Sequence, residues 1–184
     1  MTTEVYVLIG IIIIISLYIL VTYNILIKLR NGVNESFSTM DVYLKKRWEL
    51  IPNIVETVKG YAKHEKDTIT KVTELRMGNY DTLSVNSKID KNGQLTPAIS
   101  KMMLLAEAYP ELKANENYAD LSKQLTKVEE DIANARKYFN AVVKEHNNKV
   151  EMVPSNIIAK IFGFKSQKMF EVTGGERESI DLKL

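Results

Sequence analysis

The side chains that could do chemistry in this sequence begin with two histidines, His64 and His146, because cysteine is absent. The lack of thiols excludes disulfides, thiolate zinc sites, iron–sulfur clusters and catalytic cysteines. His64-Glu65 begins like a helical zinc motif, but Thr68 occupies the position where the second histidine ligand must lie. Neither histidine has the glutamate three residues earlier that a di-iron bundle requires. We therefore expect no bound metal and no cofactor.

Other catalytic motifs are also missing from the sequence. It contains no glycine-rich phosphate loop and no Gly-x-Ser-x-Gly nucleophile turn. The adjacent acids Glu129, Glu130 and Asp131 are expected to be solvated on one face of an amphipathic helix. The sequence accordingly predicts no catalytic residues and a protein that is not an enzyme.

One group of residues is a candidate interaction surface, and it consists of Lys59, His64, Glu65 and Arg76. Gly60 lies among them and costs about 1 kcal/mol of helix propensity, which indicates close approach of another backbone. His64 has two interpretations, a packing contact or part of a pocket between helices. His146 falls on an apolar seam, so a buried, hydrogen-bonded imidazole is expected there.

The chain near its start carries no charge from Val5 to Ile27. A helix of this length spans roughly 34 Å, enough for the ~30 Å hydrocarbon layer of a membrane. A cleaved signal peptide is the alternative, but the preceding Met-Thr-Thr-Glu is not positive and no small-x-small cleavage site follows. We expect a transmembrane anchor.

Positive charge lies on one side of this span. Lys and Arg are absent before it, whereas Lys28, Arg30, Lys45, Lys46 and Arg47 follow it. The positive-inside rule then predicts a single-pass protein of the cell membrane with its N-terminus outside and the rest cytoplasmic. The net charge of +2 predicts no nucleic-acid partner.

Helical periodicity dominates the rest of the chain, and we expect an all-α fold. We predict a helix from the membrane to about Leu50 and a chain reversal near Ile51, before Pro52. A second helix then carries apolar residues from Val55 to Leu75 and stops near Gly78-Asn79, and a loop follows over residues 79–95. Next come a short helix that Thr96-Pro97 opens and Tyr109-Pro110 ends or kinks, and a long helix. The apolar seam of the long helix comprises Tyr118, Leu121, Leu125, Val128, Ile132, Ala135, Phe139, Val142 and His146.

These elements predict an N-terminal transmembrane helix followed by an antiparallel bundle of about four long helices, with a coiled-coil-like seam. The expected domains are an anchor over residues 1–27, a helical bundle over 28–170 and a polar, disordered tail over 171–184.

A short segment after Pro154 mixes apolar and cationic side chains. If the long helix returns toward the membrane, this segment is a candidate membrane-surface element that includes Lys160, Phe162, Phe164, Lys165 and Lys168. The alternative is a short helix that caps the bottom of the bundle, an interpretation supported by the interruption at Gly163.

Several motifs of the chain closely resemble the LemA family of bacterial membrane proteins. They are Tyr23-Asn24, Leu29-Arg30-Asn31, Asp41-Val42, Leu44-Lys45-Lys46-Arg47, Leu50-Ile51-Pro52-Asn53, Val58-Lys59-Gly60-Tyr61, His64-Glu65, Ala108-Tyr109-Pro110, Leu112-Lys113-Ala114-Asn115, Ile132-Ala133, Ala135-Arg136, Tyr138-Phe139-Asn140, Pro154, Asn156 and Phe162. The resemblance covers residues 23 to about 171. Trp48 and Phe139 stand where relatives often carry Tyr, and residues 79–95 do not match.

The resemblance implies an N-terminal anchor, a cytoplasmic antiparallel helical bundle and no established enzymatic activity. It supplies no catalytic residues. We therefore expect a scaffold or interaction module at the inner face of the membrane, with the lipid bilayer, an unidentified protein or a second copy of the chain as partners. The alternative function is an enzyme or ligand sensor with a pocket between helices near His64 and Glu65.

Overall fold

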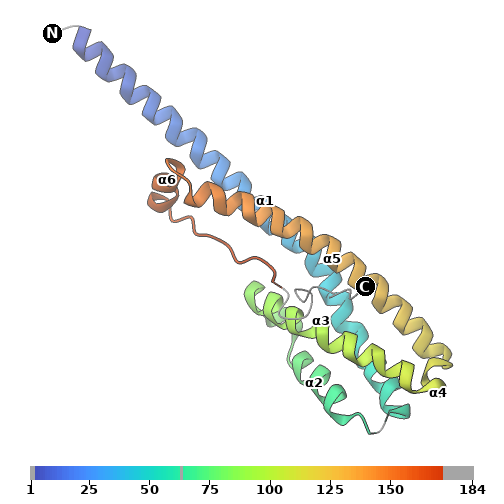
Figure 1. Ribbon diagram of the computed structural model, residues 1–184. Coiled ribbons are helices and arrows are strands. Elements are labelled where there is room, and N and C mark those ends of the chain that lie inside the picture. Colours follow the sequence, from blue (N-terminus) through green and yellow to red (C-terminus); the bar gives the residue numbers. More distant parts are fainter. Residues whose placement is uncertain (1–2, 63, 172–184) are drawn as a thin grey trace, which may run out of the picture. The chain divides into compact units, whose positions relative to one another are not determined.

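The computed structural model describes residues 3–62 and 64–171, and every regular element in those ranges is a helix (Figure 1). The elements are α1 (Thr3–Tyr61), α2 (Lys66–Arg76), the short 3-10 helix η1 (Tyr80–Thr82), α3 (Val85–Ala108), α4 (Pro110–Lys113), α5 (Glu116–Glu151) and α6 (Ser155–Ile161). The predicted all-α class is confirmed. Of the predicted tail, residues 172–184 lie outside the described residues.

The chain divides into two compact units, and α1 and α5 each contribute to both. The first unit comprises Met1–Ser38 and Lys137–Met169, and the second comprises Thr39–Arg136 and Phe170–Leu184.

The predicted chain reversal near Ile51 is wrong, because α1 runs unbroken from Thr3 to Tyr61 with Pro52 inside it (Figure 1). Proline has no N–H, so the Trp48 carbonyl four residues earlier lacks its helical donor. Arg76 Nε approaches that oxygen at 3.5 Å and provides a weak replacement. The second predicted helix is therefore two elements, the last turns of α1 and the separate helix α2.

The loop predicted over residues 79–95 is mostly helical instead. The helix α3 begins at Val85, where the Ser84 hydroxyl caps it by accepting a hydrogen bond from the Ser87 N–H at 3.2 Å. Pro97 lies inside this helix and does not open it. The buried face of α3 includes Asn92 and Gly93. Because these two residues are not large and apolar, they interrupt the apolar stripe that would have predicted a helix here.

Gly93 has a role in packing, although the pair Asn92-Gly93 is typical of a turn in sequence. A Cβ atom at this position would lie 3.0 Å from the Glu171 carbonyl oxygen, so the missing side chain allows residue 171 to approach α3. The preceding Phe170 is buried, and the Arg136 guanidinium lies 5.9 Å from its ring centroid.

The long helix was predicted correctly in position and in its buried face. Its start is capped by the Asn115 side chain, which accepts from the Tyr118 N–H at 2.9 Å. In the second unit the seam residues Tyr118, Leu125, Val128 and Ile132 are all buried. The predicted boundary at Tyr109-Pro110 is also confirmed, since α3 ends at Ala108 and α4 begins at Pro110.

The first unit has its own core between α1 and α5. The rings of Phe37 and Phe139 meet with centroids 5.9 Å apart, and both side chains are buried. Val143 is fully buried, whereas its seam neighbour Val142 is half-buried. His146 is buried as expected, with Nδ1 3.3 Å from Asn147 Oδ1.

Candidate functional site

A buried arginine organises the interior of the second unit. The guanidinium of Arg47 on α1 is completely buried and donates to both Glu129 carboxylate oxygens, at 2.9 and 3.0 Å. It also donates to the Thr96 hydroxyl at 2.9 Å and to the Asn92 side chain at 2.6 Å. A buried charge is tolerated only when it is paired and hydrogen-bonded in this way.

Sequence reasoning missed this network and expected Glu129 to be solvated. The signal was present in the register of α1, because Arg47 lies three residues after Leu44 and four before Ile51, and both of these are buried. A cation on an apolar helix face requires a buried anion opposite it. The role of Arg47 is therefore to tie α1 to α3 and α5.

A second polar group surrounds Tyr80 at η1. The Tyr80 hydroxyl donates to Asp41 Oδ1 at 2.5 Å, and Lys88 Nζ donates to the other carboxylate oxygen at 2.7 Å. Burial, followed by the hydrogen bond to Asp41, raises the pKa of Tyr80 well above its usual value. The Tyr80 ring packs on Trp48 with centroids 5.3 Å apart. These contacts position η1 against α1.

Two of the four residues predicted as an interaction surface meet in one groove between α1 and α2. Lys59 and Arg76 line it together with Ile51, Pro52, Val55, Glu56 and Thr73. The groove has a volume of about 360 Å³. Arg76 is held at its edge by the Trp48 carbonyl and by the Trp48 ring, 5.8 Å from the guanidinium carbon. The groove thus combines an apolar floor with two cations and one carboxylate, that of Glu56.

The structure does not place the other two residues of that surface among the residues that line the groove. His64 is exposed in the turn between α1 and α2. Glu65 follows it and accepts a weak hydrogen bond from the Tyr109 hydroxyl at 3.4 Å.

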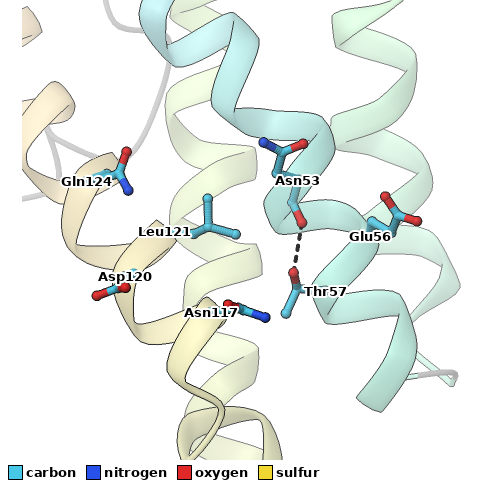
Figure 2. Close-up of a pocket in the computed structure, with 7 residues that line it drawn as sticks. All are labelled: Asn53, Glu56, Thr57, Asn117, Asp120, Leu121 and Gln124. Atoms are coloured by element: carbon cyan, nitrogen blue, oxygen red, sulfur yellow. Dashed lines mark hydrogen bonds between the residues drawn. The ribbon is translucent and has the colours of Figure 1, made fainter.

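A more polar pocket lies between α1 and α5 and contains none of the residues predicted as an interaction surface. Figure 2 shows its lining side chains, Asn53, Glu56 and Thr57 from α1 and Asn117, Asp120, Leu121 and Gln124 from α5. Its volume is about 500 Å³, and the Thr57 hydroxyl donates to the Asn53 carbonyl at 2.9 Å. Two carboxylates and no cation line it, which disfavours an anionic ligand.

The predicted membrane-surface residues divide into a buried and an exposed group in the first unit. Phe164 is buried with Leu26, Ile158 and Ala159, and Ile19, Tyr23, Ile27 and Val150 pack against this cluster. By contrast, Lys160, Phe162, Lys165 and Lys168 are exposed. The short helix α6 therefore packs against the last turns of the apolar segment of α1 (Figure 1).

Two further observations bear on the kind of site. Among residues 3–62 and 64–171, no group of three or more His, Asp or Glu side chains is placed to hold a metal ion. In the same ranges, one helix, α1, is long and apolar enough to cross a membrane. The side chains from Val5 to Leu17 are almost all exposed, so this part of α1 is not the buried core helix of a soluble domain.

The fold and these sites define a class of protein, namely an all-helical protein with a single apolar N-terminal helix long enough to span a membrane. The sequence profile of the LemA family matches residues 36–183. Because that match covers most of the chain, the protein belongs to the LemA family, as the resemblance of its motifs indicated.

The chain is also similar to individual curated proteins. It is 22% identical over 160 residues to the protein LemA of Metamycoplasma hominis, which covers 86% of this chain and 73% of that protein. It is 23% identical over 179 residues to the magnetosome protein MamQ 2 of Paramagnetospirillum magneticum, covering 83% of this chain. A similar match is 21% identity over 178 residues to the magnetosome protein MamQ of Magnetospirillum gryphiswaldense. The chain spans 66% and 65% of the length of these two magnetosome proteins.

Proposed function

We propose that this protein is a single-pass membrane protein whose helical units act as a non-enzymatic scaffold or interaction module at the inner face of the cell membrane. The observation that carries the proposal is the helix α1, which combines an exposed apolar segment with a packed amphipathic segment in one element. The apolar half suits lipid, and the other half contributes Leu44, Ile51 and Val58 to a protein core.

The proposed orientation rests on charge. Lys28 and Arg30 follow the apolar segment directly and are exposed, and no Lys or Arg precedes it. Arg47 is buried, so beyond Arg30 the exposed Lys45 and Lys46 are the cations that support the same orientation by the positive-inside rule. The N-terminus is accordingly outside and the packed helices are cytoplasmic.

The absence of enzymatic activity is supported by how the polar side chains are used. Arg47, Asn92 and Glu129 are engaged with one another, and Tyr80, Asp41 and Lys88 form a second set. Side chains that bind one another in this way stabilise a fold and are not free for acid–base work on a substrate.

The surface that recruits a partner is the groove at Lys59 and Arg76. Its apolar floor of Ile51, Pro52 and Val55 fits apolar side chains. Its two cations outnumber the single carboxylate of Glu56, which favours an acidic segment of a partner protein. A photo-crosslinking residue at Thr73, which also lines the groove, should capture one discrete protein in intact cells.

The matched control separates recruitment from general surface charge. Lys59→Glu together with Arg76→Glu should abolish capture at Thr73, whereas Lys123→Glu, an exposed lysine on α5, should leave it unchanged. Capture that persists after the double change would contradict the groove as the recruiting surface. Capture of only a second copy of the chain would identify the partner as a homo-oligomer.

A second candidate function is a ligand sensor or enzyme that uses this groove as a small-molecule pocket. The supporting observation is its volume of about 360 Å³, which falls in the range of ligand sites. His64→Ala with Glu65→Ala should leave a ligand response intact, because neither side chain lines the groove, whereas Arg76→Ala should remove it. Loss of response in the His64 and Glu65 variant would favour the pocket expected from the sequence.

A further inference from the structure

The end of α5 and the helix α6 return to the apolar segment of α1. Ile158, Ala159 and Phe164 share a buried cluster with Leu26, and Ile19, Tyr23 and Ile27 pack around it. The Tyr23 ring lies 4.8 Å from the Phe162 ring and 5.9 Å from the Phe164 ring, centroid to centroid. The position of α6 is therefore fixed to residues 19–27 of α1.

The length of the apolar segment sets the depth of this contact in a bilayer. The part of α1 that precedes Ile19, the first residue packed against this cluster, runs from Val5 to Tyr18 and has 14 residues. As an α-helix it rises only about 21 Å, which is less than the ~30 Å hydrocarbon layer. The helix must therefore supply roughly six more residues, which extends the buried span to about Asn24 and includes Ile19 and Tyr23. Any element packed on those residues lies at the membrane interface.

The exposed side chains of this region match such a position. Ile157 is 59% exposed and Ile161 is 71% exposed, and they lie one turn apart on the same face of α6. Phe162 is 50% exposed, and the preceding Met152 and Val153 are exposed as well. Five large apolar side chains grouped beside a membrane helix indicate contact with lipid.

The end of α6 explains how apolar residues face both the protein and the surroundings. Gly163 has a φ of +73°, and the Phe164 N–H donates to the Ala159 carbonyl at 2.9 Å, which is a Schellman cap. This cap turns Phe164 inward onto Leu26, where Arg30 lies 5.5 Å from its ring centroid. Ile161 and Phe162 remain outside. Lys160 and Lys165 flank them and are exposed.

We propose that α6 and the turn before it form a second membrane-contact element, in which Met152, Val153, Ile157, Ile161 and Phe162 face acyl chains while Lys160 and Lys165 face anionic lipid headgroups. This inference rests on the membrane anchoring proposed above. The buried face of the segment then acts as the cap expected from the sequence, and its exposed face is the interfacial element.

The test uses the full chain in vesicles of phosphatidylcholine with phosphatidylglycerol. Because the sequence has no cysteine, a single fluorophore can be attached at Ile161→Cys, at Ile14→Cys in the span or at Tyr138→Cys on α5. Tyr138 is a matched exposed control in the same unit, 62% exposed. Nitroxide carried on the lipid should quench the labels at Ile14 and Ile161 and leave the label at Tyr138 bright.

The outcomes distinguish this inference from the anchoring proposal. Quenching at Ile14 without quenching at Ile161 would overturn the interfacial role of α6 and leave the anchor intact. No quenching at Ile14 would overturn both proposals, and equal quenching at all three positions would also overturn the interfacial role. Lys160→Glu should reduce quenching at Ile161 in these anionic vesicles, and an unchanged value would contradict the headgroup contact.

Discussion

Arg47 shows how a single residue determines the interior of the second unit. Its guanidinium is wholly buried and bound by Glu129, Thr96 and Asn92, which belong to α5 and α3. The Glu129 side chain is 26% exposed, so water screens part of the interaction from one side. The pair is therefore a fixed cross-link among three helices with a partly solvated anion.

Removal of this anion should destabilise the second unit strongly. Glu129→Ala leaves the buried Arg47 charge without its carboxylate, and we expect a loss of about 3 kcal/mol, at the lower end for a buried pair because of the partial exposure. The measurement is urea unfolding of the full chain in detergent micelles, followed by fluorescence of the only tryptophan, the buried Trp48. The neighbouring exposed Glu130→Ala is the matched control. Equal stability of the two variants would show that the Arg47–Glu129 pair contributes little.

Tyr80 gives the protein a pH dependence in alkaline solution. Burial and the hydrogen bond to Asp41 raise the pKa of its hydroxyl above the value of 10.0 that applies to the unfolded chain. Above that pH the unfolded state loses this proton while the folded state retains it, so stability falls as pH rises. Lys45 acts in the same direction, because a hydrogen bond from its ammonium to the Asp81 carboxylate raises its pKa.

Tyr80→Phe should accordingly flatten the decline in stability above about pH 10. It should also lower stability at neutral pH by about 1 kcal/mol, since the hydrogen bond to Asp41 is lost. Tyr138→Phe, at an exposed position, is the control and should change neither value. An unaltered alkaline slope in Tyr80→Phe would refute the assignment.

At the scale of elements, the long helix α5 carries the most regular pattern of the chain. Leu125 lies in the middle of its seam and is completely buried. Leu104 on α3 is a leucine of the same unit that is 69% exposed. These two leucines therefore differ in burial and not in chemistry.

An aspartate at each of the two leucines should have very different effects. Leu125→Asp places an unpaired carboxylate in the core and should cost about 4 kcal/mol or prevent folding of the second unit. Leu104→Asp should change stability by less than about 0.5 kcal/mol. The measurement is the urea midpoint of unfolding, followed by Trp48 fluorescence, for each variant. Similar midpoints would mean that the seam is not the buried face of α5.

The limits of sequence analysis are clearest at the helix boundaries. The apolar segment, the long helix and the boundary at Tyr109-Pro110 all follow from strong local signals, and the structure confirms them. The break expected at Pro52 fails because a contact distant in sequence, from Arg76 to the Trp48 carbonyl, compensates the lost helical bond. The prediction of a loop over residues 79–95 is wrong because two residues typical of turns, Asn92 and Gly93, are buried in a helix. Asn92 accepts a hydrogen bond from Arg47, and Gly93 allows close approach of residue 171.

The candidate site was predictable only in part for the same reason. Lys59 and Arg76 could be selected as exposed cations, but the groove they share depends on how α2 packs on α1 after the turn at His64. The division of the α6 residues into buried and exposed faces depends on Leu26 and Tyr23, which lie more than a hundred residues earlier. Periodicity alone cannot predict either contact, because each joins residues that are distant in sequence.

At the scale of the whole molecule, the chain combines three properties. It has an apolar helix that suits a bilayer, positive charge on the C-terminal side of the apolar segment, and packed helical units. Membership of the LemA family is consistent with this organisation. We propose on this basis that α1 crosses the cell membrane with the N-terminus outside and the packed helices in the cytoplasm.

Cysteine accessibility in intact cells tests this claim most directly, since the native chain has no cysteine. Thr3→Cys lies at the start of α1, and Lys144→Cys lies on an exposed position of α5. A membrane-impermeant maleimide should label Thr3→Cys in intact cells and should label Lys144→Cys only after the membrane is permeabilised. Labelling of Lys144→Cys from outside, with Thr3→Cys protected, would contradict the account.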